Sequence, residues 1–221
     1  QLRKPILDVN LFRNNVVFTL SSLAALINFS ATHAVTFLIS LYLQYVKGFS
    51  PQTAGLILIC QPIIIALVSP LAGQFSDRGD PRIVASLGMA LTTIGLFSFI
   101  FLNSNTPMWL IILNLALLGV GFGIFSSPNT NAAISKVEKR VYGVALAILG
   151  TMRATGQMLS MALTTLLFAI YIGTAQITAE VHAVFLLSLR AAFVIFTALS
   201  FGGIFASLAR AKVRRRKLEE I

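Results

Sequence analysis

Residues 141–171, VYGVALAILGTMRATGQMLSMALTTLLFAIY, decide the fold class of this chain. They contain no proline and a single charged residue, Arg153. The segment is long enough to cross the ~30 Å hydrocarbon core of a bilayer as one α-helix. An arginine at the centre of a membrane helix costs about 2.5–3.5 kcal/mol on insertion scales. A chain that keeps one there is expected to use it, so Arg153 is the first candidate for a functional residue.

The same apolar character extends over the whole chain, which is 57% apolar and 11% charged, with a mean hydropathy of +0.86. The six apolar segments long enough to span a bilayer are residues 16–46, 51–75, 83–102, 108–137, 141–171 and 183–208. They are continuously apolar, whereas the strands of a transmembrane barrel alternate in polarity. We therefore predict an all-α membrane protein, a single bundle of six transmembrane helices over residues 16–208.

The net charge of +10 is unevenly distributed along the chain. The basic residues outside the spans lie before the first span, in the second and fourth loops and after the last span, and only Lys47 lies in the opposite loops. The positive-inside rule therefore places both termini, residues 1–15 and the basic tail 209–221, in the cytoplasm of a multi-pass cell-membrane protein. The tail is expected to contact anionic lipids rather than nucleic acid, because no aromatic platform accompanies it. Arg190, near the start of the last span, is expected to reach the outer interface.

The span around Arg153 carries two faces at helical spacing. Small residues form the first, at Gly143, Ala147, Gly150 and Ala154, and polar residues form the second, at Arg153, Gln157, Ser160 and Thr164. Small residues allow membrane helices to approach closely, so the first face predicts packing. The polar face predicts a water-filled cavity in which Arg153 binds a substrate or a carboxylate of another part of the transporter. The alternative is a structural clamp, in which Arg153 holds a backbone carbonyl that Pro128 leaves free near Ile124.

Polar residues also follow one face of the first span, at Ser21, Asn28, Thr32 and Thr36, with His33 beside them. This face is a second candidate wall of the cavity. His33 is either a neutral histidine that bonds between helices or a group that couples transport to protons. Weaker polar candidates are Gln61, Asn114, Asn129 and Asn131.

The glycine-rich segment GVGFG, residues 119–123, lies inside a membrane span. A dinucleotide site needs a preceding strand, so we interpret Gly119 and Gly123 as a packing pair and Pro128 as a helix kink. Other chemistry is equally unsupported: the sequence has no phosphate loop, no metalloprotease motif and no serine–histidine–acid set. We therefore predict neither an enzyme nor a cofactor or metal site.

Residues 73–85, GQFSDRGDPRIVA, resemble the loop motif G-x-L-A-D-R-x-G-R-K of the major facilitator superfamily. The matching positions are Gly73, Asp77, Arg78 and Arg82. The sequence departs from the motif at Gly79, which comes one place early, and at Asp80 and Pro81. The resemblance implies that the matching residues form a loop that latches one conformation of the transporter.

Further segments are similar, in the same order, to the C-terminal half of the fourteen-span drug:proton antiporters of that family. They are LFRNNVVF, LYLQYVKGFSPQTAGLIL, LLGVGFGIFSSPNTNAAI and GVALAILGTMRATGQMLSMAL. The resemblance implies one half of the major facilitator fold, a three-plus-three inverted repeat. The expected partners are a missing N-terminal half or a second copy of this chain, together with a small-molecule substrate. A start at Gln1 without methionine agrees with a missing upstream part.

The function expected from these observations is that of the C-terminal half of a secondary transporter, a proton-coupled exporter of drugs or other small amphipathic molecules. All seven acidic residues lie in loops or at the termini, so the coupling carboxylate is expected in the other half. One alternative is a self-sufficient six-span carrier or channel that acts as a homo-oligomer. Another is a membrane scaffold without transport, against which the polar faces of the first and fifth spans argue.

Overall fold

The computed structural model describes residues 15–135, 137–173 and 182–219, and these residues form helices and no strand. The elements are α2 (Val16–Leu41), the π-helical turn η1 (Tyr42–Val46), α3 (Pro51–Leu58), α4 (Cys60–Arg78), α5 (Pro81–Phe99), α6 (Met108–Ile134), the 3₁₀ turn η2 (Lys139–Val141), α7 (Tyr142–Tyr171) and α8 (His182–Glu219). Five helical segments are long and apolar enough to cross a membrane, and Ile83–Phe99 is a shorter apolar helix. An all-helical membrane protein is therefore confirmed.

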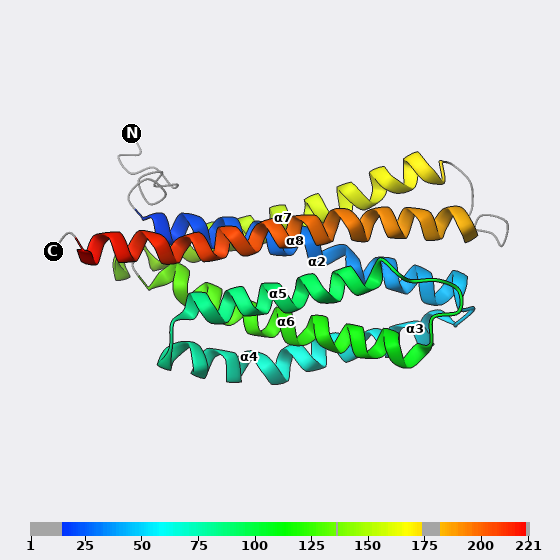
Figure 1. Ribbon diagram of the computed structural model, residues 1–221, viewed down its shortest axis with the longest axis horizontal. Coiled ribbons are helices and arrows are strands. Elements are labelled where there is room, and N and C mark those ends of the chain that lie inside the picture. Colours follow the sequence, from blue (N-terminus) through cyan, green and yellow to red (C-terminus); the bar gives the residue numbers. More distant parts are fainter. Residues whose placement is uncertain (1–14, 136, 174–181, 220–221) are drawn as a thin grey trace.

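The helices run side by side in two layers, α2, α7 and α8 in one and α4, α5 and α6 in the other (Figure 1). α2 packs against α7 and α8, and α6 packs against α4 and α5. The layers join where α5 meets α8 and α2 meets α6. The first predicted span, α2, thus packs with the fifth and sixth spans, and the fourth span, α6, packs with the second and third. This reciprocal packing agrees with a three-plus-three repeat.

Local sequence sets where several helices begin. Asn15 caps α2, because its side-chain oxygen accepts a hydrogen bond from the Phe18 amide at 3.0 Å. Ser50 caps α3 in the same way through the Thr53 amide, and Pro51 occupies the first turn. Proline also opens α5 at Pro81. The proline that departs from the loop motif therefore suits a helix start.

The second predicted span is divided in the structure. α3 ends at Leu58 and α4 begins at Cys60, with Ile59 between them still in helical conformation. The physical reason is Pro62, which has no N–H to donate to the carbonyl four residues earlier. The predicted span 51–75 is therefore two helices that follow one another in line rather than one unbroken helix.

Glycine brings helices close at the centre of the bundle. A Cβ atom added at Gly121 would lie 2.7 Å from the Thr92 backbone nitrogen, and one at Gly88 would lie 2.5 Å from that of Phe125. Gly156 meets α2 as closely, since its Cβ would lie 2.5 Å from the Leu26 carbonyl oxygen. The α5–α6 and α2–α7 contacts therefore depend on the missing side chain.

Buried polar side chains bridge the helices elsewhere. Hydroxyl pairs join α5 to α8 at Thr93–Ser200 and Ser86–Ser207, both at 2.8 Å. Asn114 donates to the Gly95 carbonyl and Asn129 donates to the Ser21 carbonyl. These asparagines therefore act as bonds between helices.

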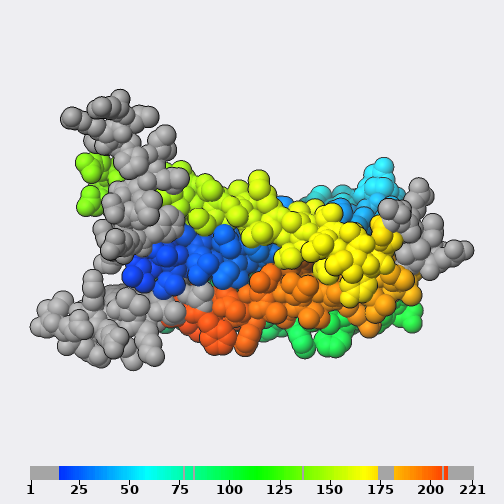
Figure 2. Space-filling model, turned by 90° about the horizontal axis from the view of Figure 1, so that it is seen from above, coloured from blue at the N-terminus to red at the C-terminus, as the bar shows by residue number. Residues whose placement is uncertain are grey.

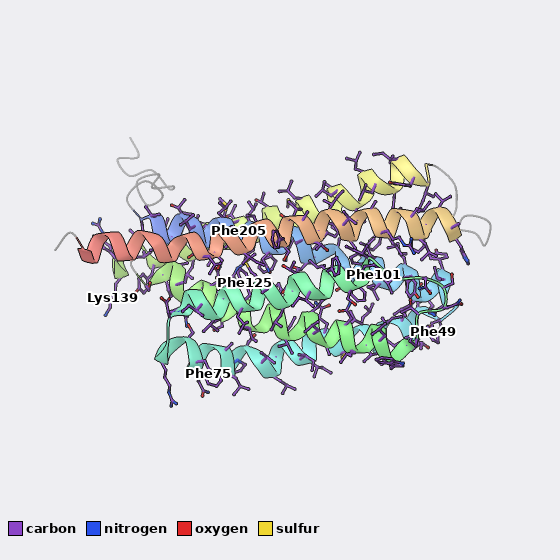
Figure 3. All side chains as sticks on the ribbon, in the orientation of Figure 1. Phe49, Phe75, Phe101, Phe125, Lys139 and Phe205 are labelled. Carbon is purple, nitrogen blue, oxygen red and sulfur yellow. The ribbon has the colours of Figure 1, made fainter. Side chains whose placement is uncertain are left out.

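The charge asymmetry runs along the long axis of the bundle. The start of α2, the end of α8 and the connections after α4 and α6 lie at one end (Figure 1). Exposed Arg78, Lys139 and Arg140 belong to that end, whereas Lys47 belongs to the other. Lys139 and Phe49 are labelled at these opposite ends in Figure 3. The basic loops thus share one end, and its cytoplasmic position stays a prediction.

Candidate functional site

Arg153 occupies the middle of α7 and turns toward α6 and α2. Its Nη2 donates a hydrogen bond of 2.5 Å to the Thr130 hydroxyl of α6. Its Cζ lies 5.8 Å from the centre of the Phe29 ring of α2, within the range of a cation–π interaction. The side chain is half-buried, and its Nε is shielded from solvent without a hydrogen-bond partner in the described part of the chain. The guanidinium is therefore held by three helices and not saturated by them.

The Phe29 ring is held in turn by Phe122 of α6. The two ring centres are 5.1 Å apart and the planes meet at 79°, an edge-to-face pair. Both phenylalanines are half-buried, like Arg153. We call Arg153, Thr130, Phe29 and Phe122 the arginine cluster.

The helical period places two polar residues of α2 on the same face as Phe29. His33 is one turn and Thr36 two turns beyond it, and both are exposed. Figure 2 shows α2 between α7 on one side and α8 on the other. The exposed histidine therefore lies along the same helix face as the ring that touches Arg153.

The polar face predicted for α7 divides into two parts. Arg153 and Gln157 are half-buried, whereas Ser160 and Thr164 are fully buried. The Ser160 hydroxyl accepts a hydrogen bond of 3.0 Å from the Ala34 amide of α2, so this residue joins two helices. The cavity hypothesis for α7 therefore retains Arg153 and Gln157.

The polar face predicted for α2 divides in the same way. Ser21, Asn28 and Thr32 are buried inside the bundle, and Thr32 donates to the Asn28 carbonyl. The side-chain amide of Asn28 has no hydrogen-bond partner among the described residues. Gln61 of α4 is buried too, beside Gly119 of α6. These four residues contribute to packing, and only Thr36 and His33 face outward.

The clamp alternative for Arg153 is present in a modified form. Pro128 lies inside α6 and is buried, and the kink predicted for it stays a prediction. Arg153, however, bonds to the hydroxyl of Thr130 and not to the carbonyl of Ile124. The arginine therefore links α7 to α6 through a side chain that the sequence did not single out.

The small-residue faces of α6 and α7 differ. Gly119 and Gly123 are buried, and their Cβ atoms would contact the Gln61 carbonyl and Val68 of α4. Gly143 and Gly150 are exposed and have no atom within 4 Å of an added Cβ. The packing predicted for the α7 glycines is therefore absent within the described chain, because α7 lies at the edge of its layer.

The conformational loop begins inside α4. Gly73 packs near the Ser127 hydroxyl of α6, at 3.1 Å from an added Cβ. Asp77 and Arg78 occupy the last turn of α4, and Arg82 follows the first residue of α5. The side chains of Asp77 and Arg82 lie outside the described atoms. The latch therefore stays a prediction.

Sequence reasoning missed Thr130, Phe29 and Phe122. Thr130 lies two residues after Pro128, and a threonine in an apolar span could have been flagged as a polar partner for Arg153. The two phenylalanines gave no signal, because aromatic residues are common in membrane spans.

A small cavity lies elsewhere, where the end of α5 meets the start of α6. It has a volume of about 100 Å³ and is lined by Ser98, Phe99, Phe101, Leu102, Thr106, Leu110, Ile111 and Asn114. A cavity of this size holds a few water molecules and no drug-sized molecule. It is therefore not the candidate site.

Comparison with known proteins gives this geometry a family context. The profile of the Major Facilitator Superfamily matches residues 9–220. The chain is 32% identical over 171 residues to the riboflavin transporter RibZ of Clostridioides difficile (strain 630), covering 76% of this chain and 36% of that protein. It is 34% identical over 163 residues to the uncharacterized transporter YebQ of Escherichia coli (strain K12), covering 74% and 35%.

The multidrug resistance protein Stp of Mycobacterium tuberculosis (strain ATCC 25618 / H37Rv) is also similar. It is 28% identical over 158 residues, which cover 72% of this chain and 29% of that protein. The chain thus spans about a third of the length of the curated relatives it matches.

Proposed function

Because this chain belongs to the major facilitator superfamily, we propose that it forms one half of a secondary transporter that works by alternating access. Its similarity to about a third of the length of longer transporters supports a half rather than a whole. The observation that carries the proposal is Arg153, a charged side chain halfway along a membrane helix, held between α6 and α2. In this proposal the guanidinium faces the transport pathway between two halves.

The edges of the two layers offer surfaces for the other half. In the most apolar stretch of the span that contains α7, 22% is buried inside the chain, and in that of Pro51–Ser76 17% is buried. The corresponding share for Val16–Val46 is 56%. The exposed face of α7 carries Gly143 and Gly150, which would permit close approach of another helix. We propose that the complementary half, or a second copy of this chain, packs on these edges.

The proposed substrates are drugs or other small amphipathic molecules, exported in exchange for protons. Two relatives support this class by their names, a riboflavin transporter and a multidrug resistance protein. His33 is the proposed proton-responsive group of this half, since it is exposed and lies midway along α2. Gly73, Asp77, Arg78 and Arg82 form the proposed conformational loop, and the basic tail touches anionic lipid on the cytoplasmic side of the cell membrane.

The test is efflux by the protein whose reading frame contains this chain, expressed in a bacterium that lacks its own efflux pumps. We expect lower susceptibility to at least one compound of a panel that includes riboflavin analogues and lipophilic drugs. Arg153→Ala should abolish that protection at unchanged protein level in the membrane. Arg190→Ala is the matched control, because it removes an exposed arginine of α8 and should leave efflux intact. Normal efflux with Arg153→Ala would contradict the proposed role of this residue.

The second candidate is a carrier or channel built from copies of this chain alone. It rests on the same exposed edges, which a second copy could cover. Purified chain in liposomes separates the two candidates, because flux without any further polypeptide requires the homo-oligomer. A lack of flux that is restored by the remainder of the reading frame supports the half-transporter.

A further inference from the structure

We infer that the arginine cluster is a binding site for aromatic anions, molecules that carry a carboxylate or sulfonate on a planar ring. This inference rests on the proposed function and names the substrate class of the proposed site. It is carried by three observations: the uncompensated charge of Arg153, the way its guanidinium is oriented, and the aromatic rings beside it.

The first observation is electrostatic. Among the described residues, no aspartate or glutamate occurs in a helical segment that could span a membrane. The Thr130 hydroxyl that accepts from Arg153 is neutral, and the Phe29 ring supplies only a quadrupole. A guanidinium in a region of low dielectric is stabilised most by an anion, so the site favours an anion from outside the chain.

The second observation is orientation. A hydrogen bond to α6 and a ring of α2 hold the guanidinium from two sides, at 2.5 Å and 5.8 Å. A side chain held in this way loses little conformational freedom when a ligand binds, which favours affinity. Guanidinium groups present their N–H donors as a planar fork that fits a carboxylate or sulfonate. Arg153 is therefore prepared to accept such a group.

The third observation is the aromatic surround. Phe29 lies under the guanidinium and Phe122 meets the Phe29 ring edge to face. Both rings are half-buried, so part of each surface is open. A flat aromatic molecule can stack against such surface while its acidic group reaches Arg153. A simple inorganic anion gains nothing from the rings, and an aromatic cation meets the charge of Arg153 as a repulsion.

The experiment compares three probes on the complete protein that contains this chain, purified into lipid nanodiscs. The probes are 2-naphthoate, its neutral isostere 2-naphthamide and the 2-naphthylmethylammonium cation, measured by equilibrium dialysis with empty nanodiscs as background. Hydrogen bonds to charged groups contribute about 1.5–3 kcal/mol, which corresponds to a preference of about tenfold or more for the anion. We therefore expect naphthoate to bind at least about tenfold more tightly than naphthamide, and the cation to bind most weakly.

Three variants identify the residues responsible. Arg153→Gln should reduce the preference for naphthoate over naphthamide to less than about threefold, with naphthamide binding almost unchanged. Arg190→Gln removes an exposed arginine of α8 and should retain the full preference. Phe29→Leu should weaken the binding of naphthoate and of naphthamide by a similar factor, because it removes the ring and leaves the charge in place.

Two outcomes would overturn the inference: equal binding of naphthoate and naphthamide to the unmodified protein, or a preference that survives Arg153→Gln. A carboxylate of the complementary half that already neutralised Arg153 would also give equal binding, and the aromatic anion site would then be rejected as well. Efflux of the drug panel, measured on the same protein, tests the proposed function separately. Efflux without anion preference rejects the aromatic anion site and keeps the transporter, whereas absence of efflux for every compound rejects the transporter itself.

Discussion

α6 and α7 each carry a row of glycines inside a membrane span, Gly119, Gly121 and Gly123 in α6 and Gly143 and Gly150 in α7. The surroundings of the two rows are opposite. In α6, Gly119, Gly121 and Gly123 are buried, and an added Cβ would meet α4 or α5 at 2.7–3.1 Å. In α7, Gly143 and Gly150 are exposed, with nothing within 4 Å of an added Cβ. Small residues at helical spacing therefore predict that a helix can be approached closely, and they do not identify what approaches it.

The difference follows from the position of each helix. α6 lies inside its layer, between α4 and α5, and it also touches α2. α7 lies at an edge and packs on α2 and α8 only along one side. Gly119, Gly121 and Gly123 of α6 are used within this chain, and so is Gly156 of α7, which meets α2. Gly143 and Gly150 of α7 are available to a partner outside it. Substitution of the two rows should therefore have opposite effects on this chain.

The largest effect is expected for Gly121→Ala in α6. The new methyl group would lie 2.7 Å from the Thr92 backbone nitrogen and 2.9 Å from the Gly88 carbonyl oxygen, and backbone atoms cannot move aside easily. Overpacking costs typically 1–3 kcal/mol, which exceeds the ~1 kcal/mol that alanine gains over glycine in a helix. We expect the free energy of unfolding to fall by up to about 2 kcal/mol, measured by reversible unfolding in mixed micelles with circular dichroism.

The control for Gly121→Ala is Gly202→Ala in α8. Gly202 is exposed and an added Cβ there has no neighbour within 4 Å. An equal loss of stability for both variants would show that the close α5–α6 contact does not depend on Gly121.

A smaller effect of opposite sign is expected for Gly150→Ala in α7. The space around this position is open, so the alanine keeps its advantage in helix propensity of roughly 0.5–1 kcal/mol. The isolated chain should therefore become slightly more stable in the same unfolding measurement. A clear loss of stability would mean that the α7 row is packed within this chain, and the contrast with α6 would disappear.

Gly150→Leu extends this comparison to the complete protein. A leucine side chain should still be tolerated by the isolated chain, since it points into open space. It should reduce efflux or association with the complementary half if that half packs on α7, as measured by native mass spectrometry. Unchanged association would place the partner surface elsewhere, on the α4 edge.

The positions of the spans could be predicted from apolar length, because the bilayer fixes how many residues a helix needs. The predicted spans 108–137 and 141–171 correspond to α6, Met108–Ile134, and α7, Tyr142–Tyr171. The break at Ile59 was not predicted, since a proline in a membrane helix can be accommodated without one. The π-helical turn that ends α2 also left no pattern in the apolar sequence.

The candidate site could be predicted only in part. Arg153 was identifiable because its charge is costly in a membrane, and this argument needs no knowledge of neighbours. The polar face of α2 was too coarse a prediction, since Asn28 and Thr36 are separated by about 80° around the helix. That angle is enough for the structure to bury Asn28 and expose Thr36. Thr130 could have been flagged as a polar residue in an apolar span, but the two rings could not be found, because their role depends on which helices touch.

The smallest expected effect concerns the polar bonds that supplement the glycine contacts. Thr93 of α5 and Ser200 of α8 form a hydroxyl pair at 2.8 Å, and Thr93 also donates to its own helix at the Met89 carbonyl, so Ser200 supplies the proton between them. Interhelical hydrogen bonds in membranes contribute about 0.6 kcal/mol on average. A double-mutant cycle of Thr93→Val and Ser200→Ala should therefore give a coupling energy of about 0.6 kcal/mol in the free energy of unfolding.

Thr197 of α8 is the control for this cycle, because its hydroxyl bonds to the Phe193 carbonyl of the same helix. Thr197→Val combined with Thr93→Val should be additive, with a coupling energy near zero. The Thr93–Ser200 coupling energy can be compared with the effect of Gly121→Ala. The comparison shows how much a polar pair contributes to the free energy of unfolding relative to a close glycine contact. A coupling above about 2 kcal/mol, as large as the Gly121→Ala effect, would mean that a hydroxyl pair between helices stabilises the bundle as much as close glycine packing does.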